Sequence, residues 1–184
     1  MNMKKLVLAI AMASGMSIGA AHAATNATAD QGHGTVTFRG SIIDSPCSIT
    51  PDTIDQVVPM GEISTKALEN GKQTSLKYFD IKLEDCDVAS LTDKTVTATF
   101  TGTETQSQAG FLALSGSASG AAIGITNQDG TNIPLGTASP VMQVTEGNNT
   151  LHFAAFLKGD GASAVVAVVP GDFNSVAKFV LAYQ

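Results

Sequence analysis

The segment "AKFVLAYQ", residues 177–184, carries the pattern that decides the fold. Its large side chains recur at every second position, which predicts a β-strand with one strongly apolar face. The residues of that face are Phe179, Leu181 and Tyr183. Soluble proteins usually protect a terminal sheet edge with a turn, a charge or a polar tail, whereas here a single Gln follows the last large side chain. We therefore expect another stretch of polypeptide to cover this edge.

The first 23 residues predict a secretory signal peptide. A short positive start at 1–5 precedes an apolar run at 6–20, and the small-x-small triplet at 21–23 is typical of a cleavage site. A retained membrane anchor is the alternative, but the run is shorter than a usual span. Removal of residues 1–23 leaves 161 residues with a net charge of −8. We expect an exported chain of one domain.

Charge and cysteine content narrow the classes of function. The acidic chain has no basic cluster, so we expect no nucleic-acid partner. Its two cysteines, Cys47 and Cys86, predict one disulfide in an exported protein. Closing a loop of about 40 residues stabilises a fold by roughly 4 kcal/mol in the chain-entropy model. A metal pair is the rival interpretation, but no His or third Cys lies at ligand spacing nearby.

Alternating segments separated by turn residues predict an all-β fold. The expected strands lie at 36–42, 79–86, 95–102, 150–159, 162–171 and 177–184, the fifth being a more fully buried run. The expected turns lie at 128–130, 146–149, 158–161 and 170–172, and 114–120 is expected to be a loop. Many short strands of this kind favour an antiparallel β-sandwich of immunoglobulin type. The Cys–Trp–Cys signature of antibody domains is absent, because the chain has no Trp.

The segment ahead of Cys47 answers the question that the terminal strand raises. Its first part, 24–34, is small and polar. Its second part alternates, with one face formed by Val36, Phe38, Gly40 and Ile42. This strand can pair within its own chain and close the sandwich. It can also fill the edge of a neighbouring copy, and repetition of that head-to-tail contact generates a fibre.

Four features together resemble the fimbrial subunits of the chaperone–usher route, of the type 1 and P-pilus kind. The resemblance covers essentially the whole chain after residue 23. In chain order, the features are "FRG" at 38–40, the frame "SPCSI" at 45–49 with "FDIKLEDC" ending at Cys86, "VPMGEIS" at 58–64, and Gly171 fourteenth from the end with a penultimate Tyr183.

The resemblance implies a domain that lacks its final strand. The implied organisation is a signal peptide at 1–23, an N-terminal donor strand extension at 24–44 and an incomplete immunoglobulin-like domain at 45–184. A periplasmic chaperone would lend a strand and hold the carboxylate of Gln184, and an outer-membrane usher would follow. In the fibre, Val36, Phe38, Gly40 and Ile42 of a neighbouring copy or related subunit would fill the acceptor edge. The implied residues of the chaperone and acceptor edge are Gly171, Phe179, Leu181, Tyr183 and Gln184.

Other polar groups offer no catalytic, cofactor or metal site. The acidic stretch 80–87 alternates toward solvent and fits no calcium loop. His33 and His152 have no nucleophile in a recognisable motif. The segment 127–132 lacks the distal Glu of a calcium loop and favours a hairpin turn. Gly40, inside an expected strand, indicates close approach of another backbone, whereas Gly171 fits equally a simple turn after Pro170.

We therefore expect a non-enzymatic structural subunit of a surface fimbria that polymerises by donor-strand exchange and supports adhesion. A minor or tip-proximal adhesin is one alternative. A monomeric secreted β-sandwich that folds its own leader back is another. The sequence leaves open whether the subunit is major or minor, and which receptor the fibre serves.

Overall fold

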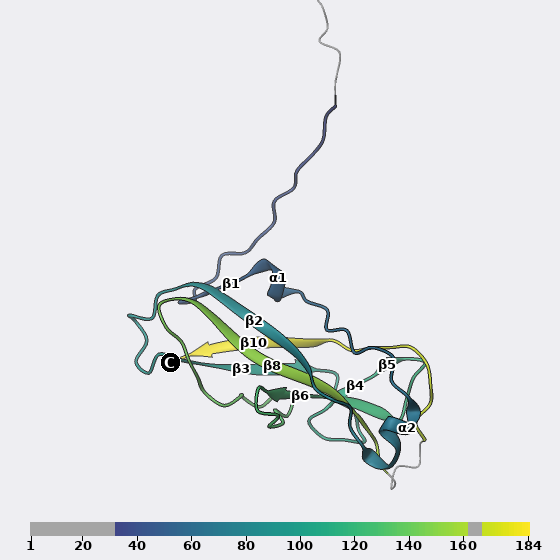
Figure 1. Cartoon of the computed structure of the whole chain (residues 1–184). Coiled ribbons are helices and arrows are strands. Elements are labelled where there is room, and N and C mark those ends of the chain that lie inside the picture. The colour runs from purple at the N-terminus through teal and green to yellow at the C-terminus, as the bar shows by residue number, and fades with distance from the viewer. Residues whose placement is uncertain (1–31, 162–166) are drawn as a thin grey trace, which may run out of the picture. The chain divides into compact units, whose positions relative to one another are not determined.

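The computed structural model describes residues 32–161 and 167–184 (Figure 1). It divides into two compact units, Met1–Ile42 and Ile43–Gln184. The expected signal peptide and most of the polar part of the leader lie outside the described residues. From residue 32 to residue 42 the leader is exposed and forms no helix or strand. The strand expected at 36–42 is thus absent from the single chain, since no strand pairs with it there.

The larger sheet of the second unit has the order β1-β2-β8-β6-β4, with every neighbour antiparallel. Its long strands, β2 and β8, run side by side through the domain (Figure 1). The bounds are β1 Ser48–Ile49, β2 Lys77–Cys86, β8 Gly147–Gly159, β6 Ala121–Asn127 and β4 Leu112–Ala113. The expected antiparallel all-β architecture is confirmed.

A second sheet has the order β10-β3-β7, and β5 pairs with β9 separately. The bounds are β3 Thr95–Gly102, β5 Ser115–Gly116, β7 Met142–Gln143, β9 Phe173–Asn174 and β10 Ala177–Tyr183. The helices are single turns: α1 Pro51–Ile54, α2 Thr65–Leu68 and the 3₁₀ turn η1 Glu69–Gly71. Because β10 comes last in its sheet, it forms an edge.

Aromatic rings hold the two main sheets together. Phe153 of β8 contacts Phe100 of β3 edge to face, with ring centroids 5.0 Å apart, and Phe79 of β2 stacks on Phe153 at 5.8 Å. Phe100 also meets Phe179 of β10 at 6.5 Å. Such pairs add about 0.5–1.5 kcal/mol each beyond the area they bury. The expected inward positions of β2, β3 and β8 therefore form the core, as the alternation predicts. The fully buried members include Ile81, Leu83, Val96, Ala98, Leu151 and Leu157.

Three expectations about local structure are wrong. The run 162–171 is not a buried strand where it is described: Ala167 is exposed, Val169 is 43% exposed, and only an isolated bridge joins Val169 to Ser119. The segment 146–149, expected to be a turn, instead contains the first residues of β8, because Gly147 pairs with Cys86 beyond a bulge in β2. The expected loop 114–120 contributes the short strand β5, which pairs with β9.

The sequence pattern also missed β6. All but the last of its residues are buried, so no polar and apolar alternation marks it. Its Gly124 has no room for a side chain, since an added Cβ would lie 2.7 Å from the Phe111 ring. Among the described residues, no helix is long and apolar enough to cross a membrane.

Candidate functional site

The site is the free edge of β10. Its register sets Phe179 opposite Phe100, Leu181 opposite Ala98 and Tyr183 opposite Val96, three core residues of β3. The ladder continues to Gln184, whose N–H donates to Thr95 O at 3.0 Å and whose carbonyl oxygen accepts from Thr95 N–H at 3.1 Å. On its other side β10 has no strand partner among the described residues. Its outward backbone groups are therefore available to an added strand.

The apolar face of β10 is only half covered. Phe179, Leu181 and Tyr183 pack against the core yet stay partly exposed, whereas their partner positions on β3 are buried. On the opposite face Val180 is 64% exposed. Covering apolar surface is worth about 25 cal/mol per Å². A strand laid against β10 thus stabilises this domain chiefly by covering those three side chains.

A pocket of about 220 Å³ lies at the C-terminal end of β10. It exceeds the ~150 Å³ apolar cavity that can hold a benzene ring, so it has room for a large apolar side chain. Its lining combines the start of the domain with the end of the chain: Ile43, Asp44, Ser45, Pro46, Ile49, Leu181 and Tyr183. Leu181 and Tyr183 are expected site residues. The other five were missed, and their position beside Cys47 is the signal that could have found them.

The phenol of Tyr183 lies in this pocket, at the C-terminal end of β10. Its hydroxyl oxygen is shielded from solvent and makes no hydrogen bond of normal geometry within the described residues. Burial raises the pKa of the Tyr183 phenol above its ordinary value of 10, and the nearby Ser45 side chain partly opposes that shift. The phenol is therefore neutral at physiological pH and suits an apolar surface.

The raised pKa gives a testable pH dependence. Because the fold favours the protonated phenol, its contribution to stability is complete below pH 10 and is lost as pH rises through the folded-state value. The chain has two tyrosines, Tyr78 and Tyr183. In an ultraviolet titration of the refolded chain, we expect Tyr183→Phe to remove a phase above pH 10. The exposed Tyr78→Phe is the control, and loss of the late phase in that variant instead would refute the assignment.

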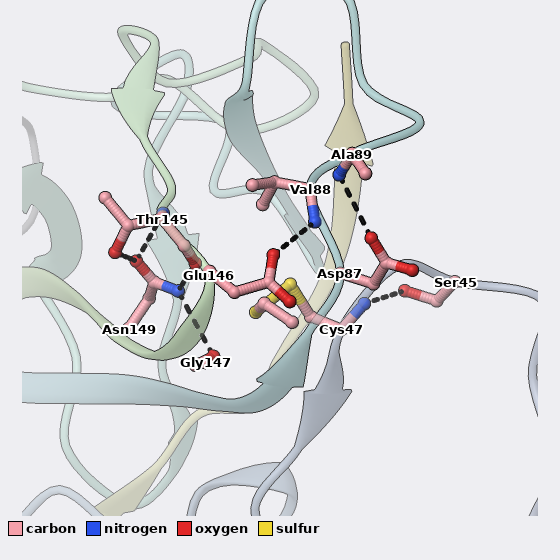
Figure 2. The surroundings of a disulfide bond; sticks show 10 residues. Ser45, Cys47, Asp87, Val88, Ala89, Thr145, Glu146, Gly147 and Asn149 are labelled. Carbon is pink, nitrogen blue, oxygen red and sulfur yellow. Dashed lines mark hydrogen bonds between the residues drawn. A yellow bond between two sulfur atoms is a disulfide. The ribbon is translucent and has the colours of Figure 1, made fainter.

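The disulfide fixes the start of the domain beside this pocket. Cys47 is bonded to Cys86, as expected, and Asp87 N–H donates to Pro46 O at 2.9 Å. Figure 2 shows the surroundings: Glu146 reaches across to accept from Val88 N–H at 3.2 Å. The segment that follows the leader is thus tied to the end of β2. This connection holds Ser45 and Pro46 at the pocket.

Loss of this bond should be severe. Removing a native disulfide from a small exported domain costs about 2–5 kcal/mol, against a usual total stability of about 5–15 kcal/mol. We expect Cys47→Ser to lower the periplasmic amount of subunit several-fold on an immunoblot. Ser48→Ala, at the exposed neighbouring position, should accumulate normally. Normal amounts of Cys47→Ser, with Cys86 alkylated in the parent protein, would contradict the role given to the bond.

The expected donor residues lie outside the domain. Phe38 is 89% exposed, Ile42 is fully exposed, and an added Cβ at Gly40 meets nothing within 4 Å. Nothing in the described chain therefore requires a glycine at position 40. Their role in a neighbouring copy stays a prediction.

Gly171 has a reason within its own fold. It lies in the bend before β9, and an added Cβ would come within 2.7 Å of Ala118 N. Asp172 N–H donates to Ser117 Oγ at 3.0 Å, and Asp172 O accepts from the backbone N–H groups of Ser117 and Ala118. Close approach to this loop explains the glycine. Gly171 is not among the residues that line the pocket, so its part in chaperone binding also stays a prediction.

Polar groups elsewhere form exposed pairs. His152 Nδ1 lies 2.7 Å from Asp80 Oδ1, and Lys82 Nζ lies 2.8 Å from Asp52 Oδ2. A hydrogen bond from Lys82 lowers the pKa of Asp52. The segment after β6 forms a turn in which Asp129 accepts from Thr131 N–H. No group of three or more potential metal ligands occurs in the described part of the chain.

Comparisons with known proteins agree on one kind of protein. The family model described as "Fimbrial protein" matches residues 36–184. The chain is 53% identical over 184 residues to the Fimbria A protein of Serratia marcescens, and the match covers all of both chains. It is 50% identical over 185 residues to the Major MR/P fimbria protein of Proteus mirabilis (strain HI4320), again over both full lengths.

Solved structures give the same result. A chain from the structure of a chaperone–usher pilus superposes with a TM-score of 0.73 at 32% identity, over 84% of this chain and 97% of that one. The crystal structure of the P pilus rod subunit PapA gives a TM-score of 0.67 at 32% identity, over 76% of this chain and 100% of that one.

Proposed function

The chain belongs to the fimbrial protein family, and on that premise we propose that it is a shaft subunit whose β10 edge is completed by the leader of the next copy. It is a structural, non-enzymatic subunit of a surface fimbria. The proposal concerns how each subunit is joined to the next in the fibre. One observation carries it: a half-covered apolar strand edge and an apolar leader that forms no strand of its own occur in the same chain.

Physical complementarity supports the join. The leader offers Val36, Phe38 and Ile42 at alternate positions, and β10 offers an apolar face with a pocket at its end. Gly40 lies between the large donor residues, where a strand can approach another backbone closely. A head-to-tail contact of this kind does not close on itself and therefore propagates. Each subunit is thereby both an acceptor and a donor.

The β10 edge must also be covered before assembly, while the subunit is in the periplasm. We propose that a periplasmic chaperone lends a strand to β10 and that its basic groups hold the carboxylate of Gln184, the residue that ends the ladder with Thr95. An outer-membrane usher would then exchange that strand for the leader. Without a covering strand, the exposed edge would favour aggregation.

Electron microscopy of cells with and without the gene tests the proposed place in the fibre. A shaft subunit predicts loss of whole fibres, whereas a minor or tip subunit predicts shortened or tipless fibres. A size measurement on the refolded chain tests the self-closed monomer. A strictly monomeric species at high concentration that never polymerises would favour that alternative.

A further inference from the structure

Charge is distributed unevenly between the two ends of the domain. β8 runs from Gly147, which pairs with Cys86, to Gly159, whose N–H donates to the carbonyl oxygen of Lys72. At about 3.3 Å per residue its 13 residues separate these ends by about 40 Å. We name them the disulfide end and the lysine end. Figure 1 shows the C-terminus at the disulfide end and α2 at the lysine end.

The disulfide end is strongly acidic. Besides the ion pair of Lys82 with Asp52, Lys94 is its one lysine among the described residues. Four of its carboxylates make no hydrogen bond or ion pair within the described residues. Its acidic side chains are Asp44, Glu84, Asp85, Asp87, Asp93 and Glu146, of which only Asp87 and Glu146 bind backbone N–H groups.

The lysine end carries five lysines and five carboxylates, and three of the lysines are uncommitted. Lys72, Lys77 and Lys178 have no side-chain partner within the described part of the chain. Several carboxylates there are engaged: Glu69 pairs with Lys66 at 2.8 Å, and Asp160 accepts from Ser107 and Gln108. The charged groups of this end are Lys66, Lys72, Lys77, Lys158 and Lys178 with Glu62, Glu69, Glu104, Asp160 and Asp172.

Chain connectivity brings one end of each copy against its neighbour. The leader unit ends at Ile42, and residues 43–46 connect it to Cys47. The domain's first residues are tied to the disulfide end by the bond between Cys47 and Cys86. If the leader fills a neighbour's groove, the donor's disulfide end therefore abuts that neighbour where the inserted strand leaves the groove.

The direction of the inserted strand decides which end it meets. β10 runs toward the disulfide end, where Gln184 pairs with Thr95. A strand parallel to β10 would leave at the acceptor's disulfide end and set two acidic surfaces together. An antiparallel strand would leave near Ala177, at the lysine end. Opposite charges steer association and like charges oppose it.

We propose, resting on the proposed function, that the acidic disulfide end of each copy docks on the lysine end of the copy whose groove its leader fills. The partner is a second copy of this chain. Lys72 and Lys77 face the uncommitted carboxylates of the donor, Glu84 and Asp93 among them. The contact sets the order of the subunits and accelerates each addition.

The test compares two full-length double variants with the same net charge. Lys72→Glu/Lys77→Glu makes the lysine end acidic. Lys82→Glu/Lys94→Glu changes the net charge equally but at the disulfide end, which stays acidic, and it leaves the lysine end as it is. Each is purified as its chaperone complex, and polymerisation is followed by light scattering at 0.01 M and 1 M salt, where the screening length is about 30 Å and about 3 Å.

At low salt we expect the first variant to polymerise about 3–10-fold more slowly than the second, with the difference gone at high salt. Adding Glu84→Lys/Asp93→Lys to the first variant should recover part of the lost rate. Equal slowing of both double variants would overturn the proposal in favour of a net-charge effect. If a double variant yields no complex, Lys72→Glu against Lys94→Glu makes the same comparison.

Gly40→Leu, measured in the same assay, separates a failure of the donor role of the leader from a failure of the docking between the two charged ends. If Gly40→Leu blocks assembly while the lysine variants match their control, only the docking of the two ends is wrong. If Gly40→Leu assembles normally, the donor role itself fails.

Discussion

Replacing Gly40 by Leu should abolish fibres while leaving the subunit folded. In a groove packed at core density, the new side chain would overpack every joint at a cost of about 1–3 kcal/mol or more. In the subunit itself an added Cβ at this position meets nothing within 4 Å, and the domain begins at Ile43. Periplasmic chaperone complex and surface fibres should be measured from the same culture. We expect a normal amount of complex and few or no fibres.

Ser41→Leu is the matched control for this change. In an inserted strand its side chain lies on the opposite face from Gly40, so it should leave fibre yield nearly unchanged. Abundant fibres from Gly40→Leu would show that this strand is not the donor in the proposed register. Loss of the complex would show instead that the leader belongs to its own fold.

Replacing Tyr183 by Asp should prevent capture of the subunit. The aspartate would set an unpaired charge on the apolar face of β10, at the pocket formed with Pro46 and Ile49, and burying such a charge costs several kcal/mol in effective terms. A chaperone strand laid on this edge would have to bury it. We expect the variant to be degraded and absent from chaperone pull-downs.

Val180→Asp provides the comparison, because Val180 lies on the same strand but is 64% exposed on its opposite face. That variant should co-purify with the chaperone at near-normal yield. Normal co-purification of Tyr183→Asp would mean that the apolar face of β10 is not the surface that is covered.

Three of the longer strands were predictable because one face of each meets solvent, whereas β6, which has no solvent face, was not. β2, β3 and β10 each alternate because one face meets the core and the other meets solvent. β6 is buried on both faces, so its residues carry no period of two. The run at 162–171 shows the opposite failure: small apolar residues suggested burial, yet Val169 lies at an exposed bridge.

The site was predictable in outline for a related reason. The alternation of Phe179, Leu181 and Tyr183 predicted an apolar strand edge that another strand must cover. The alternation around Phe38 predicted a strand that could cover it. The pocket residues from Ile43 to Pro46 follow no periodic pattern. The disulfide, which the sequence predicts, and the backbone bond from Asp87 to Pro46, which it does not, tie them to the end of β2.

A photochemical cross-link tests the central claim most directly. Phe38 is exposed and aromatic, so benzoyl-phenylalanine can replace it with little effect on the domain. Fibres grown from an equal mixture of ¹⁵N-labelled and unlabelled copies are irradiated, digested and analysed by mass spectrometry. The account predicts cross-links from residue 38 to the 177–184 peptide, with mixed-label pairs as frequent as same-label pairs. Cross-links found only between peptides of the same label would show that each copy covers its own edge, and the proposed mode of assembly would be wrong.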